Sequence, residues 1–343
     1  PPRPSADVLD LGLDVAAARE VVDFRVTGFD LKQARLTVTR AKKDVQLQIP
    51  VGLRLTPRSA SNVCAYVVAA ARTVAVAAVG GEAAVYVPVV GMDFRRLNVP
   101  VNGVEFDVAV PDKRDPVAEF LCFAAAKGAS WNALQTGVWA LTNNISRQEL
   151  AAFQLAYPDP AAPGGSRQEP LASYADIKSV ESMLSALGRD PDVCRLIVEE
   201  REERNRLVKQ VNYEKPSAGY LSILRGKDLV RYTGDSEVQK ILHRYLSQHA
   251  RQDVRRLALE NLMGLGLAGS RDEVFSKALW DHDMKMRLVA ATTLVRAGDP
   301  RGLPLLAACA DDPILGTLCA AQAETAIQKK SAQARNPEEP MLA

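Results

Sequence analysis

The side chains best suited to acid–base or metal chemistry are the three histidines of this 343-residue chain. All three lie in the C-terminal half, so none supplies a general base to the N-terminal half. His243 and His249 are six residues apart, a spacing that points their side chains to different helix faces. His282 lies between Asp281 and Asp283, and adjacent residues in a turn rarely converge on one metal ion. The pattern predicts no catalytic histidine, no metal site and no cofactor.

The five cysteines offer nucleophilic, redox or metal-binding chemistry only if they converge. They are widely spaced and form no C-x-x-C pair, which indicates neither a zinc module nor a complete disulfide framework. Most are expected to be buried thiols, although Cys309 and Cys319 could be bridged if they lie on neighbouring helices. No G-x-S-x-G, H-E-x-x-H or phosphate-binding glycine motif is present, so the sequence favours a non-enzymatic protein.

Charge and hydropathy narrow the possible partners. The chain carries 43 Lys and Arg against 41 Asp and Glu, for a net charge of +2, with opposite charges interspersed. A nucleic-acid surface would show as a basic excess or stripe, so nucleic acid is not an expected partner. The longest apolar run, from Val63 to Val79, is interrupted by Arg72 and Thr73, and no transmembrane helix is expected.

The N-terminal half has the sequence pattern of β-strands. From Val21 to Val110, short runs rich in Val, Thr and aromatic residues alternate with Gly, Pro, Asn and Asp, which predicts an antiparallel β-sandwich of about seven strands. Two helices follow, after Asp115 and after Ser130. We expect both helices to pack on the sandwich, in a domain spanning residues 19–155.

The C-terminal half has helical periodicity. Residues 156–170 hold several prolines with Gly and Ser and predict a linker. Residues 171–332 then form a predicted helical domain, so the expected fold class is α+β with two domains. Four pairs of matching residues in this domain are each separated by 32 positions, which indicates an internal repeat. The pairs are Arg255 and Arg287, Ala258 and Ala290, Leu262 and Leu294, and Gly266 and Gly298.

These repeats resemble HEAT repeats, especially the short HEAT-like units first noted in phycobilin lyases. The resemblance implies an α-solenoid, in which stacked helix pairs bury a continuous core. The acidic residues near the helix starts are expected to complement helix dipoles, and each Arg to pair with an acid of an adjacent unit; ligand binding by these residues is the alternative. The residues concerned are Asp253, Arg255, Asp283, Arg287 and Asp299.

The segment from Leu134 to Leu141 raises a separate possibility. Gln135, Val138 and Trp139 resemble the T-Q-x-A-[IV]-W stretch of thioester domains in bacterial surface adhesins, with Leu134 and Gly137 departing from it. In that family the Gln is joined to a Cys, and here Cys64 would have to be the partner. The alternative interpretation of the segment is an amphipathic helix anchored by its tryptophans.

The N-terminal half more loosely resembles β-sandwich modules of secreted bacterial proteins. Residues Leu36 to Thr39, Ile49, Pro50 and Gly52 carry that likeness together with Gln135 and Trp139. It favours an extracytoplasmic location, either periplasmic or at the cell surface. The relatives carry a Cys within the segment that is Val89 to Phe94 here, so their disulfide is not expected.

The combined expectation is an interaction or scaffold protein that binds a protein partner or assembles with itself. A solenoid offers an extended concave surface for docking, and the sandwich could add a strand from a partner. A surface adhesin with a Cys64–Gln135 thioester is the alternative. The candidate partner-binding residues on the second helices of the repeats are Phe275, Lys277, Trp280, Leu303 and Leu306.

Overall fold

The computed structural model divides the chain into two compact units, unit 1 (Pro1–Glu202) and unit 2 (Glu203–Ala343). The residues it describes are 7–11, 15–58, 63–78, 82–96, 103–112, 114–158, 166–212, 231–232, 234–249, 251–264, 277–296 and 299–309. The division falls after Glu202, not within the predicted linker at 156–170. The first helices of the predicted C-terminal domain therefore belong to unit 1, because their apolar faces pack against helices of the N-terminal half.

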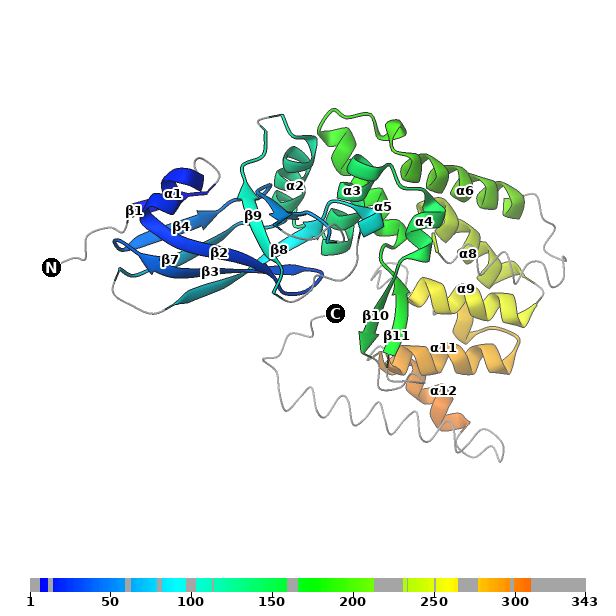
Figure 1. The fold of residues 1–343 in the computed structure, drawn as a ribbon. Helices are drawn as coiled ribbons and strands as arrows, with labels where there is room; N and C mark the ends of the chain where they lie inside the picture. Colours follow the sequence, from blue (N-terminus) through cyan, green and yellow to red (C-terminus); the bar gives the residue numbers. More distant parts are fainter. Residues whose placement is uncertain are drawn as a thin grey trace. The chain divides into compact units, whose positions relative to one another are not determined.

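Six antiparallel strands of unit 1 form a closed barrel in the order β2-β3-β8-β6-β5-β9 (Figure 1). Their bounds are β2 (Val22–Gly28), β3 (Gln33–Ala41), β5 (Arg54–Pro57), β6 (Tyr66–Val68), β8 (Ala83–Gly91) and β9 (Glu105–Ala109). Strand β9 pairs with both β2 and β5, which joins the two ends of the sheet. A barrel therefore replaces the predicted sandwich, since alternation predicts antiparallel strands but not which strands close the sheet.

A second sheet, of order β1-β4-β7, shares the core of the barrel. It consists of β1 (Asp7–Asp10), β4 (Val45–Ile49) and β7 (Arg72–Val76). The central strand β4 pairs parallel with β1 and antiparallel with β7. Helix α1 (Val15–Val21) follows β1. Val45, Leu47 and Ile49 are buried, while Gln46 is exposed, as the period-two alternation of this segment predicts.

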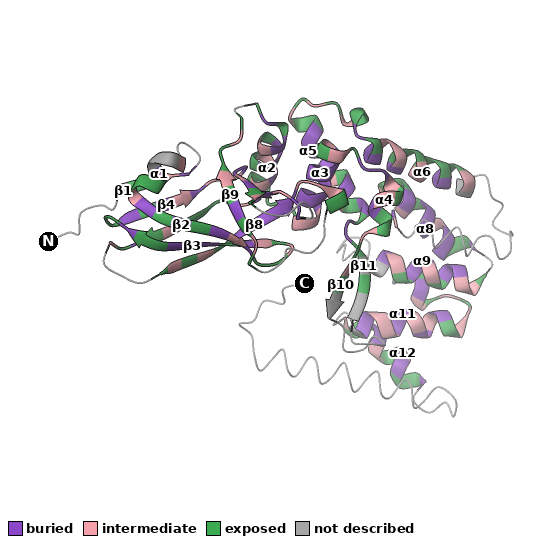
Figure 2. Ribbon diagram, in the orientation of Figure 1, coloured by how far each residue is buried: buried purple, intermediate pink, exposed green. Residues whose placement is uncertain are grey.

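Two helices, α2 (Pro116–Ala126) and α3 (Trp131–Asn143), occur where the sequence predicts them, and they pack against β6 and β8. The Asp115 side chain accepts a hydrogen bond from the N–H of Val117, and the Ser130 hydroxyl accepts one from Ala133, so each helix has a side-chain N-cap. All residues from 133 to 140 are buried, and Figure 2 shows this burial along α3. The α3 helix is thus a core element.

The remaining helices and strands of unit 1 follow α3 along the chain, and α5 packs against α3. They are α4 (Arg147–Ala152), β10 (Gln154–Pro158), β11 (Ser166–Pro170), α5 (Tyr174–Ala186) and the first part of α6 (Arg195–Asn212), with short 3₁₀ turns at Phe94–Arg96 and Pro191–Val193. Strands β10 and β11 pair antiparallel in continuous register from Gln154–Pro170 to Pro158–Ser166. The described ends of the predicted linker therefore lie in two paired strands, because paired backbone groups offset the poor strand propensity of its prolines.

The described part of unit 2 is helical. It contains α8 (Ser236–Gln248), α9 (Gln252–Gly264), α11 (Met284–Arg296), a 3₁₀ turn at Pro300–Gly302 and α12 (Leu303–Ala308). Helix α9 packs on α8, α11 packs on α9, and α12 packs on α11. The equivalent repeat residues Ala258, Leu262, Ala290 and Leu294 are all buried. Gly266, Gly298 and Cys319 lie outside the described residues.

Candidate functional site

The turn that leads into α11 is held by a buried ion pair. Arg255 of α9 donates from Nε to Asp281 Oδ2 at 2.9 Å and from Nη2 to Asp281 Oδ1 at 3.1 Å. The two side chains are only 3% and 7% exposed. Nη1 of Arg255 also donates to the backbone oxygen of His249 at 2.8 Å, which ties the end of α8 to the same guanidinium. One arginine thus joins α8, α9 and the turn before α11.

The carboxylates of this turn also form its backbone hydrogen bonds. Asp281 Oδ1 accepts from the N–H of Asp283 at 2.8 Å, and Asp283 Oδ1 accepts from the N–H of Lys285 at 2.9 Å. Both N–H groups belong to the unpaired first turn of α11 or directly precede it. The Asp283 side chain therefore caps the start of α11. The turn is fixed by side chains at its base.

Trp280 directly precedes this anchored turn and is 84% exposed. The adjacent His282 side chain is also largely exposed, and its Nδ1 lies 3.4 Å from Asp281 Oδ1. Lys277, one helical turn before Trp280, is exposed. A tryptophan carries a large apolar surface that folding normally buries. Trp280, directly before this hydrogen-bonded turn, is the most exposed large hydrophobic side chain among the described residues.

The other predicted partner-binding residues are placed differently. Leu306 is buried in a small core with Ala291 and Val295, so its side chain supports α12 and does not line a surface. Leu303 is half-buried beside the same core. Phe275 lies outside the described residues. The structure therefore leaves Lys277 and Trp280 exposed, three residues apart, and places Leu306 in the interior.

The remaining repeat residues have local partners. Asp253 accepts from Arg251 Nη2 at 2.7 Å and from the N–H of Val254, and Asp299 accepts from the N–H of Arg301 at 3.0 Å. The Nε of Arg287 is buried without a hydrogen-bond partner among the described residues. Arg255 and Arg287 occupy equivalent positions of the repeat, 32 residues apart. Of the two, only Arg255 has an ion pair with a described residue.

Cys64 and Gln135, the residues of the thioester hypothesis, both form hydrogen bonds at the C-terminal end of β8. The Gln135 side chain is fully buried, where its Oε1 accepts from the N–H of Gly91 and its Nε2 donates to the Gly91 oxygen, both at 2.8 Å. The Cys64 thiol donates to the Ala65 oxygen, and its sulfur accepts from the N–H of Asp93 at 3.1 Å. Burial raises the pKa of Cys64 to about 11, which keeps the thiol protonated near neutral pH.

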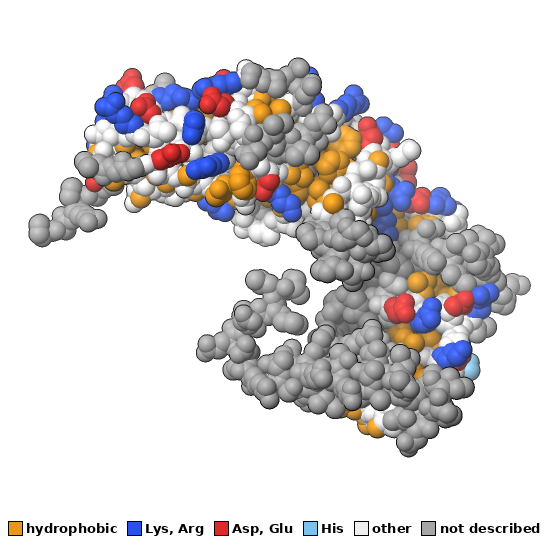
Figure 3. Space-filling view, turned by 60° about the horizontal axis from the view of Figure 1, so that its bottom comes forward, with side chains coloured by type: hydrophobic (Ala, Val, Ile, Leu, Met, Phe, Trp, Pro, Cys, Tyr) orange, Lys and Arg blue, Asp and Glu red, His pale blue; other side chains and the backbone are white. Residues whose placement is uncertain are grey.

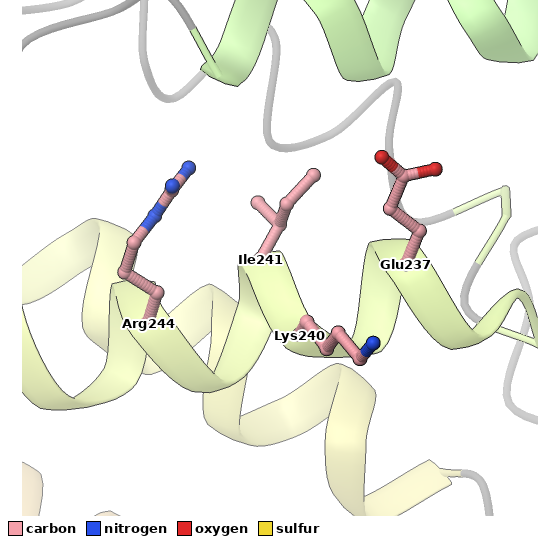
Figure 4. Close-up of a pocket in the computed structure, with 4 residues that line it drawn as sticks. All are labelled: Glu237, Lys240, Ile241 and Arg244. Atoms are coloured by element: carbon pink, nitrogen blue, oxygen red, sulfur yellow. The ribbon is translucent and has the colours of Figure 1, made fainter.

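Other features of the described residues carry little chemistry. No cluster of three or more His, Cys, Asp or Glu side chains among them could hold a metal ion. A depression of about 580 Å³ on α8 is lined by Glu237, Lys240, Ile241 and Arg244 (Figure 4). The Glu237 carboxylate there accepts from Arg204 Nη2 at 2.7 Å, so it is already paired.

No helix in the described part of the chain is long and apolar enough to cross a membrane.

Comparison with known proteins identifies no relative, since no family model, curated protein or solved structure matches this chain. The assignment of function therefore depends on the geometry alone.

Sequence reasoning named Arg255 but missed Asp281 and His249 as its hydrogen-bond partners. The signal that could have found Asp281 is the repeat itself, because an arginine on the buried face of a helix requires a nearby acid in the next unit. The exact acid is ambiguous in the sequence, where Asp281 and Asp283 lie two positions apart. Only the helix packing distinguishes the buried carboxylate from the capping one.

Proposed function

We propose that this is a non-enzymatic interaction protein whose unit 2 docks a protein partner through the surface around Trp280. The observation that carries the proposal is the 84% exposure of Trp280 directly before a turn anchored by Arg255 and Asp281. Tryptophan is enriched among residues that dominate binding energy in protein interfaces. A side chain on a turn that is already rigid costs less conformational entropy on binding.

The helical repeat pattern supports the same role. Packed helices that share one core present successive surfaces without any need for a catalytic site. The HEAT-like solenoid remains part of the proposal, supported by the 32-residue spacing and by the burial of Ala258, Leu262, Ala290 and Leu294. Lys277 adds a cation beside Trp280, and exposed Lys and Trp together suit a partner with an apolar pocket and a polar rim.

Cross-linking mass spectrometry on protein captured from its native source tests this function. We expect reproducible links from residues 250–310 to one other protein, and loss of most of them in Trp280→Ser. Val193→Ser is the matched control, because Val193 of unit 1 is also an exposed hydrophobic side chain, 68% exposed. Links only between copies of this chain, chiefly through residues 21–110, would contradict partner docking and indicate self-assembly.

A second candidate function is the thioester adhesin, which is favoured by one observation. Cys64 and Gln135 form hydrogen bonds to Asp93 and Gly91, two residues apart at the end of β8. Against it, both ends of the Gln135 amide are already bonded and the thiol is protonated. A thioester requires loss of ammonia from the amide, so the intact mass of native protein would be about 17 Da below the sequence mass. An unchanged mass excludes it.

A further inference from the structure

The second sheet of unit 1 ends in a strand that has a neighbour on one side only. In the order β1-β4-β7, strand β7 pairs with β4 alone, in continuous register from Val45–Val76 to Ile49–Arg72. In the described part of the chain, β8 contacts β7 without a hydrogen-bonded ladder between the two strands. An edge strand of this kind presents unpaired backbone groups that can pair with another chain.

The backbone groups on the free side of β7 belong to Thr73 and Ala75. The N–H of Leu11 donates to the Gln48 oxygen at 3.1 Å, so the backbone groups of Gln48 point toward β1. Thr73 lies opposite Gln48, and Ala75 lies two residues further, so both occupy non-hydrogen-bonded positions of the β4–β7 pair. Their N–H and C=O groups therefore point away from β4, and these groups form no backbone hydrogen bond with another described residue.

Strand β7 lacks the features that usually protect a sheet edge. Edge strands are commonly blocked by proline, by a bulge or by charged side chains. The sequence of β7 is RTVAV, with one charge at its first residue, and its register with β4 has no shift. The opposite edge of the same sheet, β1, carries an acid at both ends, Asp7 and Asp10. Of the two edges, β7 is therefore the one open to pairing.

The two faces of β7 differ in exposure. Val76 is buried, and Val74 is partly buried against the core that the two sheets share. Val85 of the neighbouring strand β8 is also partly buried at this core. Thr73 and Ala75 are exposed on the other face. A strand that pairs with β7 must therefore present apolar side chains on the face of Val74 and small uncharged side chains on the opposite face.

Strand β7 itself meets this requirement. In an antiparallel pair of two β7 strands centred on Val74, the outward groups of Thr73 meet those of Ala75 in the second copy. Arg72 lies opposite Val76, so no like charges face each other. The two copies are then related by a two-fold axis, the commonest symmetry of protein oligomers. Figure 3 shows Lys and Arg side chains interspersed with Asp and Glu over unit 1, so charge in this view favours no partner of one sign.

We propose that β7 is the edge through which two copies of this chain join their sheets. Pairing forms backbone hydrogen bonds at Thr73 and Ala75 of both strands and covers Val74 across the two-fold axis. The combined sheet has the order β1-β4-β7-β7-β4-β1. This contact involves unit 1 alone, so it can exist together with partner docking at Trp280.

Sedimentation velocity of the full-length protein tests the pairing with Ala75→Pro. Proline removes the outward N–H of residue 75, and its ring occupies the place of an approaching strand, whereas the bonds to β4 are made by the neighbouring residues and remain. We expect a concentration-dependent dimer of the wild type and a Kd at least about tenfold weaker in Ala75→Pro, because the symmetric interface loses each bond twice.

Val8→Pro is the matched control. Val8 is 55% exposed on β1 and lies three residues before Leu11, whose N–H points to β4. Because backbone groups alternate along a strand, the N–H of Val8 points to the other edge of the same sheet. Val8→Pro should therefore leave the Kd of the dimer unchanged.

Disulfide trapping tests the register independently of how well the proline variant folds. The background is Cys122→Ser, which removes an exposed thiol and is itself the control. Val74→Cys places two sulfurs opposite each other at the axis, within the reach of a disulfide. We expect oxidation to give covalent dimers with Val74→Cys and few with Thr73→Cys, because Thr73 lies opposite Ala75 in this register.

Several outcomes would overturn the proposal. They are a wild type that stays monomeric at high micromolar concentration, an unchanged Kd in Ala75→Pro, an equal loss in Val8→Pro, and equal trapping by Thr73→Cys and Val74→Cys. A monomeric chain whose β7 cross-links to another protein from the native source would overturn it in favour of a foreign strand. Trp280→Ser should leave the dimer intact, and a lost dimer in that variant would assign self-association to unit 2.

Discussion

The Arg255 guanidinium and the Asp281 carboxylate form a two-point ion pair across the boundary between α9 and the turn before α11. Both side chains are buried, so the two charges lose their hydration. In return, the ion pair connects two consecutive helices. The same turn carries Trp280 on its exposed side. The stability of this pair therefore determines how rigidly the proposed docking side chain is presented.

Removing the arginine should destabilise unit 2 strongly. Arg255→Met leaves the Asp281 carboxylate buried without its partner, and loss of one member of a buried pair costs about 3–5 kcal/mol. Urea unfolding followed by circular dichroism measures the change. The neighbouring Arg256→Met is the control, since Arg256 pairs with Glu260 on the surface at 3.6 Å and its loss should cost under about 1 kcal/mol. Equal effects of the two variants would contradict the assigned role of Arg255.

Acid should weaken unit 2 through His249. Burial holds the pKa of His249 below its usual value of 6.5, and Nδ1 accepts from the N–H of Arg251 at 3.1 Å, which fits a neutral ring. Charged neighbours have opposing effects, because Asp253 favours the imidazolium and Arg251 and Arg255 disfavour it. Because the folded pKa is the lower one, the unfolded state takes up the proton first. Stability is therefore complete above pH 6.5 and declines as pH falls toward the folded pKa.

The pH effect is measured as the urea midpoint of unit 2 between pH 7.5 and 5. We expect the midpoint to fall in the wild type and to fall less in His249→Gln, which cannot titrate. His282→Gln is the control, because the His282 side chain is 81% exposed. A slope that stays the same in His249→Gln would show that another group is responsible.

A methyl group at position 137 should disrupt the packing of α2 on α3. A Cβ built on Gly137 would lie 2.2 Å from Phe120 Cζ, a distance that no relaxed contact allows. Gly137→Ala should therefore lower the free energy of unfolding of unit 1 by about 1–3 kcal/mol, despite the better helix propensity of Ala. Phe120→Leu in the same chain should restore part of the loss. Gly234→Ala, where no atom lies within 4 Å of the added Cβ, should be close to neutral in thermal melting.

Loss of the Gln135 amide should destabilise unit 1 even if no thioester exists. Gln135→Leu leaves the N–H and the oxygen of Gly91 without the side-chain partners they have at 2.8 Å. An unpaired buried polar group costs about 1–3 kcal/mol, so a decrease of several kcal/mol is expected in chemical unfolding. Gln46→Leu is the control, because Gln46 is exposed on β4. A neutral Gln135→Leu would show that the amide is not a structural connection between α3 and β8.

Local sequence patterns predicted the elements of unit 1 better than their assembly. The alternation of Val45, Leu47 and Ile49 and the caps at Asp115 and Ser130 depend on residues only a few positions apart, and the structure contains the elements they predict. The closure of the barrel depends on β9 pairing with β2, about 80 residues earlier in the chain by its register, Val26 with Phe106. Such long-range pairing has no local signal.

By itself, the sequence determined that the chain has a β-rich half followed by a helical half, and it identified Arg255, Gln135 and Trp280 as residues of interest. Only the tertiary structure decided what each does. Arg255 connects helices inside unit 2 because helix packing places Asp281 beside it. Gln135 is hydrogen-bonded to Gly91 because α3 lies against β8. Trp280 is exposed because no described element covers its turn. Residue type and spacing specify local conformation, whereas burial and partners arise only when distant segments pack together.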